Sequence, residues 1–81
     1  MTREEIEAAV IEEIGNIAPE ADLAALGPAE DIRDALDMDS MDVMNLVIAL
    51  HRRFHVDIPD ADAARFVTVG GAAGYLAAKL E

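Results

Sequence analysis

Cysteine is absent from the 81 residues of the sequence. Disulfide bonds, thiolate metal sites and a thiol nucleophile of the chain's own are therefore excluded, so any sulfur chemistry has to come from an attached group. A membrane-spanning run is absent too, because the longest uninterrupted aliphatic stretch, residues 46–50, is far shorter than the roughly 20 residues that cross a bilayer. The polar start, Met1 to Glu5, is not followed by the apolar region of a secretory signal. We expect a soluble, cytoplasmic protein.

Basic residues are scarce: the chain has six lysines and arginines against 17 aspartates and glutamates, and its formal net charge is −11. The acids are concentrated before residue 40, since residues 1–39 hold 12 acids and only two bases. Such a field repels nucleic acid and anionic membranes and speeds encounter with basic protein surfaces. We therefore expect a monomer with cationic protein partners, no nucleic acid and no membrane insertion. Acidity that serves solubility alone is the alternative.

Strand patterns are also missing, because the only β-branched run, residues 67–69, is too short to pair. Apolar residues at helical spacing instead predict an all-α fold. A capping box at Thr2 and Glu5 begins a first helix that ends near residues 15–16. A second helix is predicted over residues 40–54.

A short third helix is predicted to begin at residues 57–60, with Pro59 in its first turn, and to end near Arg65. The last helix is capped by Thr68 and continues to the end of the chain. Eighty-one residues fit one domain. The sequence thus predicts a single domain over residues 1–81, built as a small four-helix bundle of three main helices and a short third one.

Residues 18–39 join the first two main helices and are predicted to form one long loop. Proline and glycine interrupt this stretch, and four scattered apolar residues are expected to pin it to the core: Leu23, Leu26, Ile32 and Leu36. A loop of this length is unusual in a small domain, which indicates a functional role.

The predicted second helix has two apolar faces. One face falls within an arc of about 100°, the width of a core-facing stripe, and comprises Val43, Leu46, Val47, Leu50 and Phe54. The other comprises Met41, Met44 and Ile48 and lies about 120–180° away, next to Ser40. The first face must be buried, whereas the second is either covered by a loop or free for a partner.

Ser40 stands among three carboxylates, Asp37, Asp39 and Asp42, where the second helix begins. The commonest role for a residue at this position is helix capping, by Asp39 or by Ser40 itself, which contributes about 1 kcal/mol. Alternatively, a hydroxyl at a helix N-terminus can carry a phosphodiester, whose charge the free backbone N–H groups favour. The carboxylates are poor phosphate ligands and suit the docking of a basic enzyme better.

Catalysis and metal binding fit the sequence less well. A nucleophilic serine needs a nearby base, and the two histidines, His51 and His55, lie about 16–22 Å along the same helix from Ser40. They also lack a third ligand for a metal site. A calcium loop beginning at Asp37 would need glutamate where Ile48 stands. We expect no enzyme activity and no metal site.

The motif around Ser40 resembles that of a known family. The residues from Asp39 to Leu50, which begin Asp-Ser-Met, are similar to the Asp-Ser-Leu segment and second helix of acyl carrier proteins. The resemblance covers residues 32–76 in register and the rest by pattern. It continues through Phe54, Asp57-Ile58-Pro59-Asp60, Phe66, Thr68-Val69 and Tyr75-Leu76.

The resemblance implies that Ser40 accepts 4′-phosphopantetheine from coenzyme A, added by a phosphopantetheinyl transferase that uses Mg²⁺. The thiol of this arm would carry acyl groups as thioesters and present them to acyl-loading and acyl-processing enzymes, such as an acyl-ACP ligase, a ketosynthase or an acyltransferase. The residues implied in recognition by the transferase or partners are Asp37, Asp39, Met41, Asp42, Met44, Ile48 and Arg52. The candidates for lining the acyl chain, or for plain core, are Leu46, Val47, Phe66 and Val69.

Three departures from the family pattern indicate a specialised lipid or secondary-metabolite pathway. Polar or basic residues occupy partner-facing or nearby positions that are often acidic: Asn45, His51, Arg52 and Arg53. Asp37 replaces a common glycine, so the turn before Ser40 is expected to differ. The loop at residues 18–28 is also longer than in compact members. A general carrier of fatty-acid synthesis, a peptidyl or aminoacyl carrier, and an unmodified helical interaction domain are the alternatives.

Overall fold

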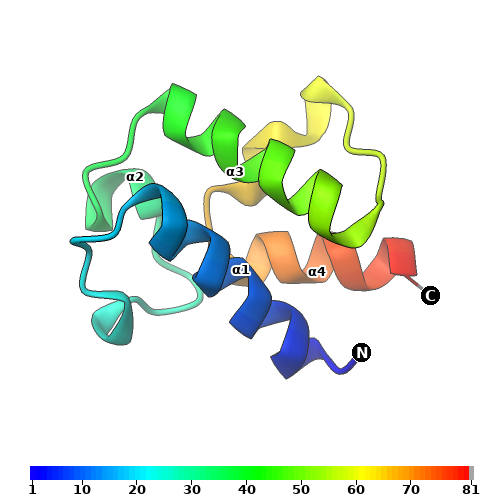
Figure 1. Ribbon diagram of the computed structural model, residues 1–81, viewed down its shortest axis with the longest axis horizontal. Helices are drawn as coiled ribbons and strands as arrows, with labels where there is room; N and C mark the ends of the chain where they lie inside the picture. The colour runs from blue at the N-terminus through cyan, green and yellow to red at the C-terminus, as the bar shows by residue number, and fades with distance from the viewer. Residues whose placement is uncertain (81) are drawn as a thin grey trace.

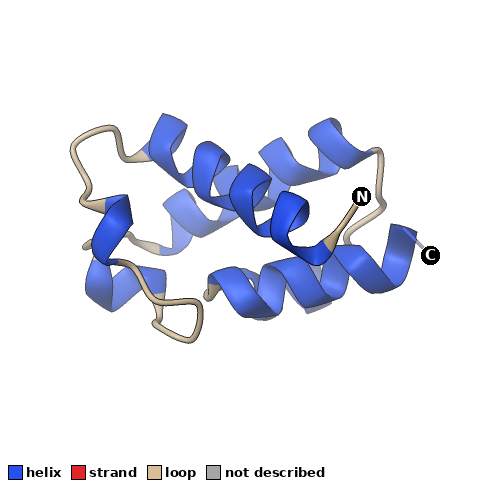
Figure 2. Ribbon diagram, turned by 90° about the horizontal axis from the view of Figure 1, so that it is seen from below, coloured by secondary structure: helices blue, strands red, loops and turns tan. Residues whose placement is uncertain are grey.

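The computed structural model describes residues 1–80 and shows helices but no strand in that range. The predicted all-α class is therefore confirmed. Helix α1 packs against α3 and α4, and the 3-10 helix η2 packs against the same pair from another side. Figures 1 and 2 show that both termini lie at one end of the bundle. The elements are α1 (Arg3–Ile17), η1 (Leu23–Ala25), α2 (Ile32–Ala35), α3 (Ser40–Phe54), η2 (Asp60–Phe66) and α4 (Val69–Leu80).

Helix α1 begins as the sequence predicts and ends slightly later. The Thr2 hydroxyl accepts a hydrogen bond from the Glu5 N–H at 3.1 Å, and the Glu5 carboxylate accepts one from the Thr2 N–H at 2.8 Å. The helix passes the predicted end at residues 15–16 and stops at Ile17, since Ile17 packs against the core and the next N–H still bonds to Ile14 O.

The predicted long connection over residues 18–39 joins α1 to α3, but it contains two short elements that the sequence did not predict, η1 and α2 (Figure 1). Asp31 caps α2 by accepting a hydrogen bond from the Arg33 N–H. Ile32 is fully buried, and its N–H donates to Val67 O at 2.8 Å, which ties α2 to the end of η2. The part of the segment that contains α2 therefore packs on the bundle beside the start of α3.

The short third helix is a 3-10 helix, η2, and Pro59 precedes it instead of lying in its first turn. Phe66 at its end is fully buried and meets Tyr75 of α4 edge to face, with the ring centroids 5.1 Å apart. The Tyr75 hydroxyl donates a hydrogen bond to Asp62 at 2.6 Å. These contacts attach η2 to α4.

Buried residues from the four larger elements, together with Ile32, Met38 and Val56, form one hydrophobic cluster. The predicted inner face of α3 is buried at Val43, Leu46, Val47 and Leu50, while Phe54 is half-buried. The α4 backbone approaches η2 closely at Gly71, where an added Cβ would lie 2.5 Å from Arg65 O. No helix among residues 1–80 combines the length and apolar character needed to cross a membrane.

Candidate functional site

Ser40 is the first residue of α3, and its side chain is exposed. The cap of this helix is Asp39: its carboxylate accepts a hydrogen bond from the Asp42 N–H at 2.9 Å, and the Asp42 carboxylate accepts one from the Asp39 N–H at 3.1 Å. Asp39 thus fills the capping role for which both residues were candidates. The Ser40 hydroxyl is not needed to hold the helix end.

Four side chains of the sequence carry a hydroxyl: Thr2, Ser40, Thr68 and Tyr75. Thr2 and Thr68 accept hydrogen bonds from backbone N–H groups at the starts of α1 and α4, and Tyr75 donates to Asp62. Within residues 1–80, Ser40 has the one hydroxyl that makes no hydrogen bond to the protein. The chain therefore presents a single exposed and unengaged hydroxyl for covalent modification.

A pocket of about 210 Å³ opens beside this hydroxyl. It lies between α2, the first turns of α3, and η2 with the residue that follows it. Its lining residues are Arg33, Ser40, Val43, Met44, Ala63, Ala64 and Val67. Apart from Ser40 and Arg33, these side chains are apolar, so the pocket offers an apolar surface next to Ser40.

Arg33 is the only charged side chain that lines this pocket, and it is not among the site residues predicted from the sequence. Its guanidinium makes two hydrogen bonds to Asp31, from Nε at 3.0 Å and from Nη2 at 2.6 Å. These bonds, followed by the one from the Arg33 N–H, lower the pKa of Asp31. The available signal was local, an aspartate cap two residues before an arginine, but the contact between α2 and α3 was not visible in the sequence.

The three carboxylates around Ser40 differ in their surroundings. Asp37 and Asp39 are exposed, whereas Asp42 is half-buried, and the capping bonds occupy one oxygen each of Asp39 and Asp42. Asp37 has φ 55°, the left-handed conformation that glycine adopts most easily. The turn before Ser40 thus has a backbone conformation suited to glycine, although its residue is an aspartate. Within the part of the chain that the structure describes, no group of three or more potential metal ligands occurs.

The second apolar face of α3 divides into two parts. Met41 and Ile48 are exposed, with 65% and 43% of their surface accessible. Met44 is half-buried and lines the pocket. The residues predicted to line an acyl chain or form plain core, Leu46, Val47, Phe66 and Val69, are buried in the core and do not line the pocket beside Ser40.

The basic end of α3 is largely engaged within the protein. Arg53 forms ion pairs with Glu12 and Glu13 of α1, at 3.0 and 2.9 Å, both through Nη1. The His51 ring donates from Nδ1 to Val56 O at 2.7 Å. His55 ends the helix in the left-handed conformation. Arg52 is exposed and has no ion pair within residues 1–80.

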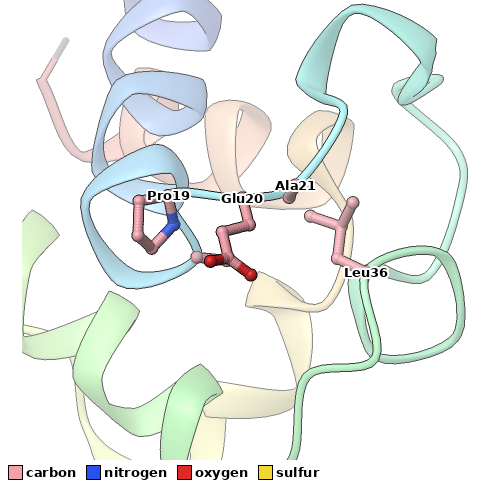
Figure 3. Close-up of a pocket in the computed structure, with 5 residues that line it drawn as sticks. Pro19, Glu20, Ala21 and Leu36 are labelled. Carbon is pink, nitrogen blue, oxygen red and sulfur yellow. The ribbon is translucent and has the colours of Figure 1, made fainter.

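A larger pocket, of about 340 Å³, lies between the end of α1 and the residue that follows α2 (Figure 3). Its lining consists of Ala18, Pro19, Glu20, Ala21 and Leu36. Figure 3 shows the Glu20 side chain between Pro19 and Leu36. None of these residues carries a hydroxyl, so this pocket contains no attachment point for a phosphodiester.

Comparison with known proteins matches residues 4–76 to the family model of the phosphopantetheine attachment site. The chain belongs to the acyl carrier protein family. It is 33% identical to the acyl carrier protein of Helicobacter pylori strain J99 over 73 residues, covering 90% of this chain and 87% of that protein. It is also 33% identical over 84 residues to that of an Exiguobacterium species, strain AT1b, covering 99% of this chain and all of the relative.

A solved structure of the thermally stable acyl carrier protein from Enterococcus faecalis agrees with the fold, with a TM-score of 0.80 and 34% identity. The alignment covers 98% of this chain and 99% of that one. The acyl-carrier type of four-helix bundle is thereby confirmed. Acyl carrier proteins are carriers and not enzymes, and the family's covalently attached group is phosphopantetheine. Its phosphodiester needs a protein hydroxyl, and the free hydroxyl beside the 210 Å³ pocket meets that requirement.

Proposed function

We propose that Ser40 carries the 4′-phosphopantetheine arm and that residues 1–81 form one carrier domain. In the attachment step the Ser40 oxygen bonds to the phosphorus that bears the arm, the phosphoanhydride bond of coenzyme A breaks, and adenosine 3′,5′-bisphosphate leaves. The hydroxyl proton passes to a base of the phosphopantetheinyl transferase, which also holds the Mg²⁺. When bound, the arm supplies a thiol, which this cysteine-free chain lacks, and holds acyl groups as thioesters.

The observation that carries this assignment is the free hydroxyl of Ser40. Thr2, Thr68 and Tyr75 use their hydroxyls to hold the fold, whereas the start of α3 is capped without Ser40. Ser40 can therefore be modified at no cost in structural hydrogen bonds. Asp37, Asp39 and Asp42 supply negative charge around it for a basic transferase surface.

We propose further that Met41 and Ile48 form the centre of the partner-recognition face, with Met44 at its pocket-side edge. Long apolar side chains exposed on a helix next to a modification site suit several partner enzymes, and methionine adapts its shape readily. Leu46, Val47, Phe66 and Val69 stay candidates for contact with an acyl chain, which would have to open the core to reach them.

We assign the carrier to a specialised lipid or secondary-metabolite pathway in the cytoplasm, with partners such as an acyl-ACP ligase, a ketosynthase or an acyltransferase. The support is the exposed Asn45 and Arg52 on α3, where an acidic surface would suit the usual basic partners. The charge of Arg53 is paired with Glu12 and Glu13 of α1, so Arg53 is not part of this support. General fatty-acid synthesis and a peptidyl or aminoacyl carrier are the competing assignments.

Intact-mass measurement after incubation with coenzyme A, Mg²⁺ and a broad-specificity transferase tests the attachment. The wild-type protein should gain one phosphopantetheine, and Ser40→Ala should gain none. Thr2→Asn is the matched control, because asparagine keeps the helix cap while removing another hydroxyl, and this variant should be modified as the wild type is. A wild-type protein that stays unmodified would favour an interaction domain without the arm.

A further inference from the structure

The pocket beside Ser40 contains one cation in an otherwise apolar lining. Arg33 of α2 and Ser40 of α3 line the same space of about 210 Å³. Arg33 is one of only two basic residues in the first 39 positions of a chain with net charge −11. Arg33 thus places a cation beside Ser40 in a part of the chain that is otherwise strongly acidic.

Asp31 holds the Arg33 guanidinium along the edge formed by Nε and Nη2. Nε and Nη2 donate to the two carboxylate oxygens of Asp31, while Nη1 makes no hydrogen bond within the described residues. The side chain is 51% exposed, so the remaining donors are open to solvent. A guanidinium fixed in this way loses little freedom when it binds a second oxyanion.

We propose that Arg33 binds the phosphodiester of the arm carried on Ser40. This inference rests on the proposed attachment at Ser40: a phosphorus bonded to the Ser40 oxygen would lie beside the pocket that Ser40 and Arg33 both line. Arginine is the side chain best suited to phosphate oxygens, since it combines charge with several directed donors.

A contact between Arg33 and the phosphodiester would offset the negative charge of the acids around Ser40. Asp37, Asp39 and Asp42 flank the serine along the chain, and their field opposes the added negative charge of a phosphodiester. The free N–H groups at the start of α3 offset part of this repulsion. Arg33 approaches from another element and offsets more of it. The acids that attract the transferase are thereby compatible with a stable modified protein.

A thermodynamic cycle between modification and mutation tests the proposal. The unfolding constants of the unmodified and modified forms are measured in urea for the wild type and for Arg33→Gln. For each protein, the effect of modification is the unfolding constant of the unmodified form divided by that of the modified form. This ratio should be about two to five times larger for the wild type than for Arg33→Gln, the range for a solvent-exposed charged pair. Arg52→Gln is the matched control, because it removes the same charge from α3 at a residue that does not line the pocket. The ratio for Arg52→Gln should be almost the same as for the wild type.

Two further variants separate the contact from general electrostatics. Asp31→Asn keeps the cap of α2 but removes the carboxylate that fixes the guanidinium, so it should reduce the coupling without abolishing it. Arg33→Lys should retain only part of it. A ratio for Arg33→Gln equal to that of the wild type, or equal ratios for Arg33→Gln and Arg52→Gln, would overturn the proposal.

Direct observation of the wild type does not depend on the folding of any variant. The Arg33 Nε–H resonance should shift between the unmodified and modified protein, and the Arg52 resonance should not. Unchanged Arg33 resonances would contradict the contact. Intact mass is recorded on every sample. A missing adduct would refute the attachment itself, whereas an adduct without coupling would refute only the role of Arg33.

Discussion

Asp39 and Asp42 exchange two hydrogen bonds across the first turn of α3, each carboxylate accepting from the other's backbone N–H, at 2.9 and 3.1 Å. Ser40 lies between them in the sequence and takes no part in this exchange. The helix end that positions the serine is therefore stable without the serine's own hydroxyl. The capping of α3 by Asp39 and the proposed modification of Ser40 can therefore be separated by mutation.

Replacing Asp39 by alanine should lower the free energy of unfolding by about 1 kcal/mol, because α3 loses its cap. Ser40→Ala should change it by less than about 0.5 kcal/mol, as expected for an exposed residue that makes no structural bond. Urea unfolding of the unmodified proteins measures both values. Asp39→Asn, which retains a capping oxygen, should behave almost as the wild type. Equal losses for Asp39→Ala and Ser40→Ala would instead assign a structural role to Ser40.

Replacing Asp37 by glycine should stabilise the protein by roughly 0.5 kcal/mol. Asp37 adopts φ 55°, which is unfavourable for a side-chain-bearing residue, and glycine removes this cost while adding a smaller entropic one. Thermal or urea unfolding gives the difference. Asp37→Val should destabilise the protein, because a β-branched side chain tolerates this conformation poorly. A glycine variant less stable than the wild type would show that the aspartate makes a favourable interaction of its own.

Replacing Ile48 by glutamate should lower the kcat/KM of a partner enzyme by about tenfold, since a loss of roughly 1.4 kcal/mol is typical of an important interface residue. Leu80→Glu is the matched control, because both residues are 43% exposed but Leu80 lies on α4. The circular dichroism spectrum and unfolding midpoint should be unaffected in both variants. Equal kcat/KM values for Ile48→Glu and Leu80→Glu would contradict a recognition face centred on Met41 and Ile48.

The stability of the fold should fall above about pH 10, where tyrosine ordinarily ionises. The hydrogen bond from Tyr75 to Asp62, and next its burial, raise the pKa of the Tyr75 hydroxyl above its usual value of 10. The unfolded chain therefore loses this proton at a lower pH than the folded one. The contribution is complete below pH 10 and is lost as the pH rises through the folded pKa.

Tyr75→Phe removes this effect and isolates it. Urea unfolding of both proteins between pH 8 and pH 11 should show the wild-type advantage shrinking at the alkaline end. The sole tyrosine also reports its own ionisation by absorbance, so the folded pKa can be read directly. Parallel pH profiles for the two proteins would mean that the hydrogen bond to Asp62 does not stabilise the neutral hydroxyl.

The helices of this protein could be predicted because their determinants are local. Helical spacing identified the inner face of α3, from Val43 to Leu50, and the Thr2 and Glu5 pair identified the start of α1. The segment before Ser40 was harder, since α2 is a single turn whose stability depends on the burial of Ile32 and its bond to Val67. Such a short element leaves no periodic pattern in the sequence.

The candidate site could be predicted only where a motif marks it. Ser40 and its flanking acids follow one another in the sequence, whereas Arg33 reaches the pocket through the packing of α2 on α3 and η2. The same reason explains the basic end of α3: the pairing of Arg53 with Glu12 and Glu13 joins residues about 40 positions apart. Contacts between elements decide which charges are free, and sequence spacing alone does not reveal them.

Fragment-ion mass spectrometry of the protein isolated from its own cells tests directly whether Ser40 carries the arm. We expect phosphopantetheine on the peptide that contains residue 40, with fragment ions placing the phosphodiester on Ser40. The acyl group on the arm would also identify the pathway. An arm on any other residue, or a protein that lacks the arm when the cells are actively making acyl products, would contradict the attachment at Ser40.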